Sequence, residues 1–303
     1  MKNQNVSTST YVIEAFDRLP VGAFAFGLQE RITKGIKDAV KFKLPLNAEI
    51  ITNPAEVQDS LLGAYKLPFP KVCIEFDTDY PSPDLGHMGT SAAKSVCTYA
   101  EHLPSIKKFA ESVGVYGAPD VEGFFAHSTA LSENGVWVPT FFAAIVPYYI
   151  DGFKREKGKS KIPFSCFNMG GIIGKRGYEL TLGATRLDMV NEYYLDVSAV
   201  LNVSLCNLCE NVEHEVKREP KHTNKTRLKK GKHPFFEYRT LVIKQKQNHD
   251  KISISNQKRK GVRQHLRRGH IRKLPTGKLT WVKHSIVGDV SRGVVSKNYK
   301  IEV

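Results

Sequence analysis

An Asn-Gly pair between two apolar runs is the feature that most limits how this chain can fold. Residues 124–132 and 136–147 are rich in apolar and aromatic side chains, and only Glu133, Asn134 and Gly135 separate them. Asn-Gly accepts the positive φ angles of a type I′ turn at low steric cost, so the pattern is typical of a β-hairpin. Two strands this apolar need cover, and the sequence predicts a sheet with other elements packed on it.

Three further stretches predict helices, and the first two along the chain, at residues 21–43 and 53–65, are expected to cover the sheet. Residues 21–43 repeat apolar side chains near every fourth position, and residues 187–216 repeat them at spacings of three and four. Residues 53–65 begin with Asn53-Pro54, an N-cap followed by a proline suited to the first helical turn.

Two more strands are expected beside the hairpin, at residues 72–80 and 162–169. With the three helices they give an α+β fold: a mostly antiparallel sheet with covering helices, and a basic β-rich C-terminal part.

The charge of the chain is divided unevenly along its 303 residues. Residues 217–303 contain 25 Lys and Arg against 5 Asp and Glu, whereas residues 1–216 contain 20 against 25. We therefore expect a mildly acidic α+β body at 1–216 and a strongly basic, nucleic-acid-facing region at 217–303, because a basic patch is the electrostatic footprint of a polyanion binder. A solvated basic tail is the alternative, and residues 217–234 are interpreted as a basic connector.

The cysteine content and the N-terminus favour a reducing cytoplasm. The five cysteines are odd in number, and the first residues contain no apolar run of signal-peptide type. Because no stretch reaches about 18 consecutive apolar residues, we expect no membrane segment.

Two groups of side chains have metal-ligand character. Glu75, Asp77 and Asp79 share one face of a predicted strand, where they could hold Mg²⁺ or Mn²⁺ or simply face water. Cys206 and Cys209, followed by His214 and His222, could bind zinc, although the spacing fits no strong zinc pattern and small thiols on an apolar helix are ordinary core residues. We predict no metal and no cofactor. His127, in the first strand of the hairpin, is interpreted as a core or edge histidine.

Residues 171–177 form a glycine-rich motif, GIIGKRG. It resembles the Ile-Gly-x-x-Gly signature of KH domains, which clamp single-stranded nucleic acid. KH domains place a helix on each side of this signature, whereas the residues before Gly171 here predict a strand. The alternative is a glycine-rich turn that exposes Lys175 and Arg176 to phosphate.

A second hairpin is predicted around Pro275, Thr276 and Gly277. With Thr276-Gly277 as a two-residue loop, Arg272 pairs with Trp281, and guanidinium and indole stack on one exposed face.

Two C-terminal stretches, residues 224–238 and the HLRRGHIR sequence from His265 with Trp281-Val282 and Val287-Gly288, resemble a family of bacteriophage and prophage proteins. The resemblance covers about the last 80 residues, and more loosely residues 66–70 and 74–77. It implies a phage or mobile-element protein in the cytoplasm of a bacterial host cell, and it implies no activity.

These observations predict a phage-type protein that binds RNA or DNA through its basic C-terminal hairpin. The candidate nucleic-acid-binding residues are Arg263, Arg267, Arg268, Lys273, Trp281, Lys283, Lys175 and Arg176.

Two alternatives stay open. A metal-independent ribonuclease would use His265 and His270 as base and acid and Arg272 to stabilise the charged phosphorane, which requires both histidines on one face. A phage protein with a basic surface could instead dock an acidic host protein and block host defence.

Overall fold

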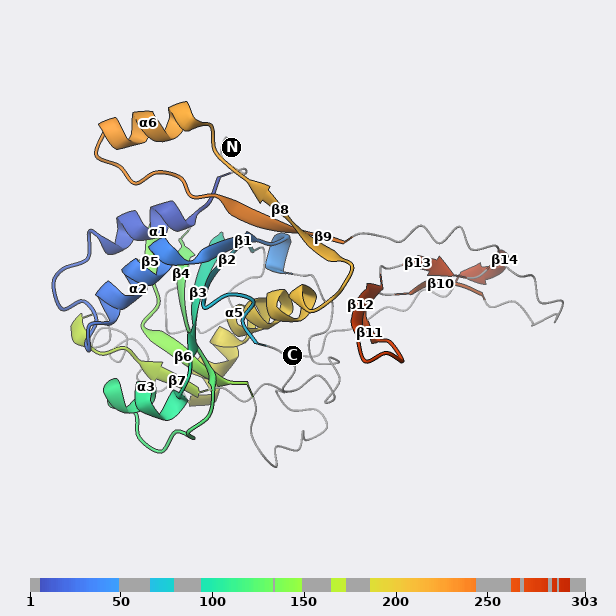
Figure 1. The fold of residues 1–303 in the computed structure, drawn as a ribbon, viewed down its shortest axis with the longest axis horizontal. Helices are drawn as coiled ribbons and strands as arrows, with labels where there is room; N and C mark the ends of the chain where they lie inside the picture. Colours follow the sequence, from blue (N-terminus) through green and yellow to red (C-terminus); the bar gives the residue numbers. More distant parts are fainter. Residues whose placement is uncertain are drawn as a thin grey trace.

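The structure of the chain, a computed structural model, describes residues 6–48, 66–78, 94–132, 134–148, 165–172, 186–243, 263–267, 270–282, 285–287 and 289–294. Its centre is a nine-stranded sheet with the order β7-β6-β4-β3-β2-β1-β9-β8, in which β5 also pairs with β4 (Figure 1). The strands are β1 (Val40–Lys43), β2 (Lys71–Asp77), β3 (Ser95–Leu103), β4 (Gly123–Leu131), β5 (Trp137–Pro139), β6 (Phe142–Pro147), β7 (Ser165–Asn168), β8 (Val212–Lys217) and β9 (Tyr238–Ile243).

Helices cover both faces of this sheet (Figure 1). On one face, α1 (Ser9–Phe16), α2 (Leu28–Asp38) and α3 (Ile106–Ser112) bury apolar side chains against strands β2 to β4 and β6. On the other, α5 (Arg186–Asn207) packs on the opposite side chains of the same strands, and a 3-10 turn, η1 (Leu46–Ala48), adds to that core. Strand β1 is parallel to β2 and β9, and the other pairs are antiparallel. The predicted α+β fold with a mostly antiparallel sheet is confirmed.

The hairpin predicted around Asn134-Gly135 forms, but its turn is not the expected type I′ turn with Asn-Gly at the centre. Gly135 donates its N–H to the Ser132 carbonyl at 3.0 Å, so it is the last residue of the turn, and Ser132 donates its N–H to the Val136 carbonyl at 2.9 Å. Gly135 has a φ of 75°, and β4 pairs with β5 directly after the turn and with β6 farther along. The strands expected at 72–80 and 162–169 are β2 and β7, with shorter described bounds. The helix predicted at residues 53–65 lies outside the described residues.

The two long helix predictions were wrong at their ends. Residues 21–43 contain α2 only from Leu28 to Asp38, and Val40–Lys43 is strand β1, because Val40 and Phe42 pair alongside β2 and contribute to the core. Residues 187–216 contain α5, but Val212–Lys217 is strand β8. In both places apolar residues of a following strand coincide with the helical spacing.

The basic C-terminal region begins inside the main sheet. Strand β9 lies between β1 and β8, and the β8–β9 ribbon carries a helix, α6 (Lys221–Lys229), between its strands. Residues 217–234, interpreted above as a connector, therefore contain an ordered helix. Beyond β9, β11 (His270–Lys273) and β12 (Leu279–Val282) form a hairpin, and β10 (Arg263–Arg267), β13 (Ser285–Val287) and β14 (Asp289–Val294) form a three-stranded sheet.

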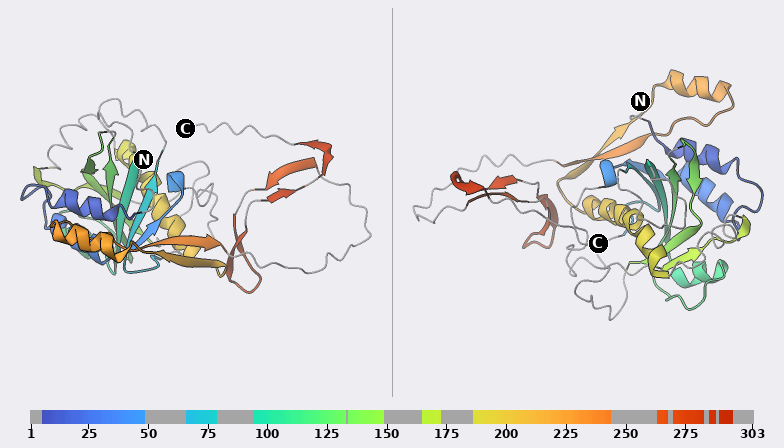
Figure 2. Two further views of the ribbon diagram at one scale, coloured as in Figure 1. Left: turned by 90° about the horizontal axis from the view of Figure 1, so that it is seen from above. Right: turned by 180° about the vertical axis from the view of Figure 1, so that it is seen from behind.

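Figure 2 shows the β11–β12 hairpin beside the end of the β8–β9 ribbon that lies away from α6. Asn211, just before β8, fixes this contact, because its side-chain oxygen accepts the Trp281 N–H at 2.8 Å and its amide donates to the Trp281 carbonyl at 2.8 Å. Within the described residues, no helix is both long and apolar enough to cross a membrane.

Candidate nucleic-acid interface

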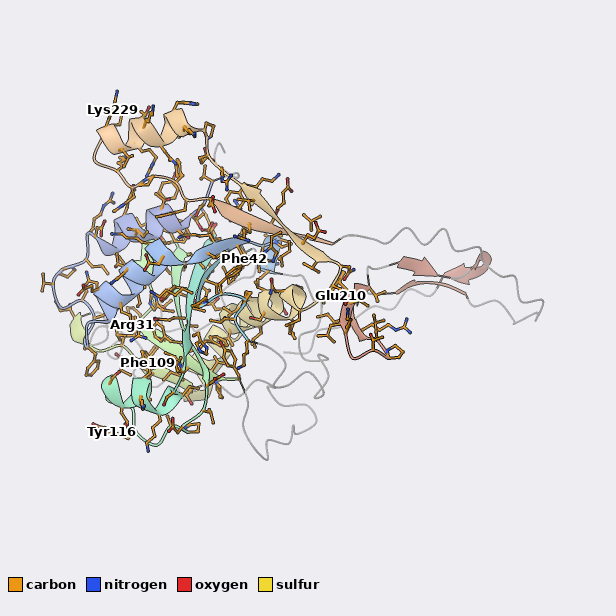
Figure 3. The ribbon with its side chains drawn as sticks, in the orientation of Figure 1. Arg31, Phe42, Phe109, Tyr116, Glu210 and Lys229 are labelled. Atoms are coloured by element: carbon orange, nitrogen blue, oxygen red, sulfur yellow. The ribbon has the colours of Figure 1, made fainter. Side chains whose placement is uncertain are left out.

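Helix α6 is the most basic described element of the chain. Its sequence, KHTNKTRLK, contains no acidic residue, and Pro220 precedes it while Gly231, with a φ of 65°, ends the turn that follows it. None of its residues is fully buried. Figure 3 shows α6 outside α1, with Lys229 at its outer end.

One face of α6 is fixed to the protein by Arg227 and Asn224. The Arg227 guanidinium lies 2.5 Å from Glu14 of α1, donates to the His233 carbonyl at 2.7 Å, and stacks 4.2 Å from the centre of the Phe235 ring. Asn224 donates to the Phe235 carbonyl and accepts the Phe235 N–H. These contacts fold the chain after α6 back onto the helix.

The return segment is fixed to α1 as well. His233 lies 2.6 Å from Asp17, and Thr10 donates its hydroxyl to the Pro234 carbonyl at 3.0 Å. Phe236 packs on the ammonium of the buried Lys41, 4.1 Å from the ring centre. Acidic groups of α1 thus hold the basic helix in place.

Helix α1 is itself anchored by a buried carboxylate. Glu75, in the middle of β2, accepts four hydrogen bonds: from the Ser7 hydroxyl, the Thr8 N–H, and both the N–H and the hydroxyl of Ser9. The carboxylate satisfies backbone donors at the start of α1, where negative charge is favourable. A chain of contacts therefore runs from the core through α1 to α6.

Another side of α6 carries Lys221, Lys225 and Lys229, the α6 lysine stripe. Residues four apart lie on one side of a helix, so the three exposed ammonium groups form a row. None of the ion pairs formed between described residues includes them. Like charges at this spacing destabilise a helix by about 0.2–0.5 kcal/mol per pair, and a polyanion bound along the row would remove that repulsion.

The β11–β12 hairpin exists, but in a register one residue away from the expected one. Ile271 pairs with Trp281 and Arg272 with Thr280, and Leu274 donates its N–H to the Lys278 carbonyl at 2.7 Å. A shift of one residue moves every side chain to the other face. Trp281 is therefore 8% exposed and packs in the α5 core with Leu279, while Arg272 is exposed.

The predicted stacking of Arg272 on Trp281 was therefore wrong, and Trp281 is a core residue rather than a nucleic-acid contact. The burial of Trp281 in the core on the α5 side of the sheet outweighs the weaker gain from an exposed cation-π pair.

The structure separates the backbones of the two proposed catalytic histidines. His265 lies on β10, paired with Val287 of the three-stranded sheet, and His270 lies on β11, paired with Val282 of the hairpin. Arg263 and Arg267 are at the ends of β10, and Lys273 pairs with Leu279. Other candidates lie outside the described residues: Arg268, Lys283, Lys175 and Arg176.

The carboxylate face of β2 differs from the expected open face. Glu75 is buried and its oxygens are engaged by α1, Asp77 accepts the Ser95 hydroxyl, and Asp79 lies outside the described residues. In the parts of the chain that the structure describes, no group of three His, Cys, Asp or Glu side chains is arranged to hold a metal.

The cysteine pair and His127 have core environments. Cys206 and Cys209 are buried, and burial raises the pKa of the Cys209 thiol to about 11. His214 contacts Arg239 and Phe42, and His222 is exposed on α6. His127 is buried, with Nε2 3.3 Å from the Thr140 carbonyl, and burial lowers its pKa to about 4.

The KH-like motif follows a strand, not a helix. Strand β7 ends at Asn168, and Gly170 and Gly171 both have positive φ angles. A Cβ at Gly171 would lie 2.5 Å from the Gly22 carbonyl oxygen, so this glycine allows two loops to pack closely.

The sequence interpretation missed the α6 lysine stripe. Its signal is present as lysines at 221, 225 and 229 directly after Pro220, which favours the start of a helix. No protein-family model, curated protein or solved structure matches the chain.

Proposed function

We propose that this chain is a phage-type nucleic-acid-binding protein whose basic C-terminal region, residues 217–303, binds the sugar-phosphate backbone of RNA or DNA. The observation that carries the proposal is the α6 lysine stripe: three exposed ammonium groups in a row on a helix that Arg227 and Asn224 fix to the protein. Lysines that are held in position without carboxylate partners are suited to phosphate contacts.

Carboxylates of the acidic body anchor the segment that carries the α6 lysine stripe and, among the described residues, do not pair with its lysines. Glu14 and Asp17 are used by Arg227 and His233 on the anchored side of the segment, so these carboxylates do not neutralise the stripe. Exposed Arg272 adds a further cation at the hairpin beside the other end of the ribbon.

The proposal is tested by measuring binding and integrity of labelled single-stranded RNA and duplex DNA together, at two salt concentrations. We expect binding that weakens steeply as salt rises, because each phosphate contact releases counterions, with both nucleic acids remaining intact. The double variant His265→Ala/His270→Ala should bind as the wild type does.

Two results would contradict the proposal. Cleavage that the double variant loses would make the chain a ribonuclease that uses the two histidines. An absence of binding even at low salt would direct attention to an acidic host protein as the partner of the basic surface.

A further inference from the structure

A second cationic group lies on the β8–β9 ribbon, apart from the α6 lysine stripe. In the antiparallel register, His214 pairs with Leu241 and Val216 with Arg239, so alternation places His214, Val216 and Arg239 on one face. The Arg239 Nη1 donates to His214 Nδ1 at 3.3 Å. The same guanidinium lies over the Phe69 ring, 5.1 Å from its centre.

These contacts fix the protonation of the pair. A guanidinium has donors only and stays charged, so Nδ1 of His214 must accept and the ring is neutral. Burial and, secondarily, the charge of Arg239 lower the pKa of His214 in agreement with this arrangement. The Phe42 ring meets the imidazole edge to face at 5.4 Å and holds it in place.

Arg239 differs from the other partly buried or paired arginines of the described chain. Arg31, Arg218 and Arg227 each contact a glutamate, at 2.9, 2.8 and 2.5 Å. No ion pair between described residues involves Arg239, whose hydrogen-bond partner is a neutral ring. The cluster therefore keeps a full positive charge in a fixed orientation.

Such a guanidinium is suited to a phosphate. One face stacks on Phe69, His214 occupies one donor, and the remaining N–H groups lie in a planar fork that matches phosphate oxygens. The group also lies on the ribbon that carries α6, since β8 ends at Lys217, just before that helix.

We infer that Arg239, positioned by His214 and Phe69, binds a backbone phosphate of the same nucleic acid that contacts the α6 lysine stripe. This inference rests on the proposed function. Phe42 and Phe69 lie in the core on the α5 side of the sheet, whereas α6 is fixed to α1 on the other side, so the nucleic acid would pass around the edge strand β8 between the two groups.

The experiment compares Arg239→Gln with Arg218→Gln in the full chain. Arg218 is a matched control, because it lies on the same ribbon–helix segment but is 74% exposed and already paired with Glu237. Binding of fluorescein-labelled poly(U) RNA and of a labelled duplex DNA is measured over a range of salt concentrations. The two ligands separate single-strand from duplex recognition.

We expect Arg239→Gln to weaken binding about three- to tenfold and to reduce the slope of log K against log salt by about 0.7–0.9, the value for one lost phosphate contact. Arg218→Gln should change both quantities much less. Arg239→Lys keeps the charge, so it should retain the slope with an affinity between those of wild type and Arg239→Gln.

Thermal unfolding of each variant separates binding from packing. If Arg239→Gln unfolds at a lower temperature but keeps the affinity and slope of Arg218→Gln, Arg239 is a packing residue and the inference is overturned. If the wild type shows no salt-dependent binding, the proposed function is wrong, and the inference, which rests on it, is wrong as well. Normal wild-type binding with an unchanged Arg239→Gln slope overturns the inference alone.

Discussion

Arg227 of α6 and Glu14 of α1 form an ion pair of 2.5 Å across 213 residues of sequence, and their side chains are only 14% and 17% exposed. This pair joins the basic segment to the helix that Glu75 anchors in the core. The position of the α6 lysine stripe therefore depends on contacts that run from α6 through α1 to the core.

Removing one member of this pair should destabilise the protein. Glu14→Gln leaves a largely buried guanidinium without its counter-charge, so we expect the free energy of unfolding to fall by about 1–3 kcal/mol. Chemical denaturation measures the change. Glu215→Gln, which breaks the exposed pair with Lys217, is the control and should change stability by less than about 0.5 kcal/mol. Equal effects of the two substitutions would show that α6 is not held by Arg227.

Replacement of the buried carboxylate should have a larger effect. Glu75→Gln removes the charge that accepts four hydrogen bonds from residues 7–9 and turns an amide N–H₂ towards groups that are themselves donors. We expect a loss of about 2–4 kcal/mol in the free energy of unfolding. Asp77→Asn, on the same strand but at its exposed end, should cost about 1 kcal/mol or less. A mild effect of Glu75→Gln would contradict the anchoring of α1.

His127 should make stability depend on pH. Burial lowers its pKa to about 4, against 6.5 for an unperturbed histidine, so the unfolded chain binds a proton at this position that the folded chain does not. The neutral ring therefore contributes about 3 kcal/mol to the free energy of unfolding above about pH 6.5. This contribution is lost as the pH falls from about 6.5 to about 4, and below that it no longer changes.

Denaturation curves of the wild type and His127→Gln between pH 4 and 7 measure this contribution. The variant should show a flatter pH dependence than the wild type, whereas His222→Gln, on the exposed α6 surface, should keep the wild-type slope. A His127→Gln slope as steep as that of the wild type would assign the acid sensitivity to other groups.

The hairpin register predicts opposite roles for two neighbouring residues. Trp281→Ala should lower the free energy of unfolding by about 3–5 kcal/mol, because it leaves a cavity in the α5 core. Arg272→Ala should change stability by no more than about 0.5 kcal/mol, because its side chain is exposed, and it should weaken nucleic-acid binding. The fluorescence emission of Trp281 can be measured in the variant Trp137→Phe, which removes the other tryptophan. An emission maximum typical of a solvent-exposed indole would contradict the observed register.

Much of the fold could be predicted because local signals and burial agree there. Asn134-Gly135 favours the turn that joins β4 to β5, and the apolar runs on each side form central strands. The errors occur where two periodicities overlap: Val40 fits the helical spacing that begins in α2, yet the strand β1 places it beside Val72. A single sequence does not reveal which tertiary partner is available.

The candidate interface was predictable in its charge but not in its geometry. The basic composition directs attention to residues 217–303, whereas residues 217–234 were interpreted as a connector and the helix α6 within them was not predicted. No pattern in the sequence indicates that Glu14 and Arg227 come into contact. The register of Trp281 depends on its burial in the core and on its backbone hydrogen bonds to Asn211, which a turn motif alone does not determine.

The most direct test of the nucleic-acid interface is the salt dependence of binding for Lys221→Gln/Lys225→Gln/Lys229→Gln. The control removes three exposed lysines from the acidic body, as Lys34→Gln/Lys107→Gln/Lys108→Gln, with the same change in net charge. If the α6 lysine stripe contacts phosphates, the first variant reduces the slope of log K against log salt by about 2–3 for duplex DNA, and the control leaves it near the wild-type value. Equal slopes for the two variants would contradict a nucleic-acid interface on α6.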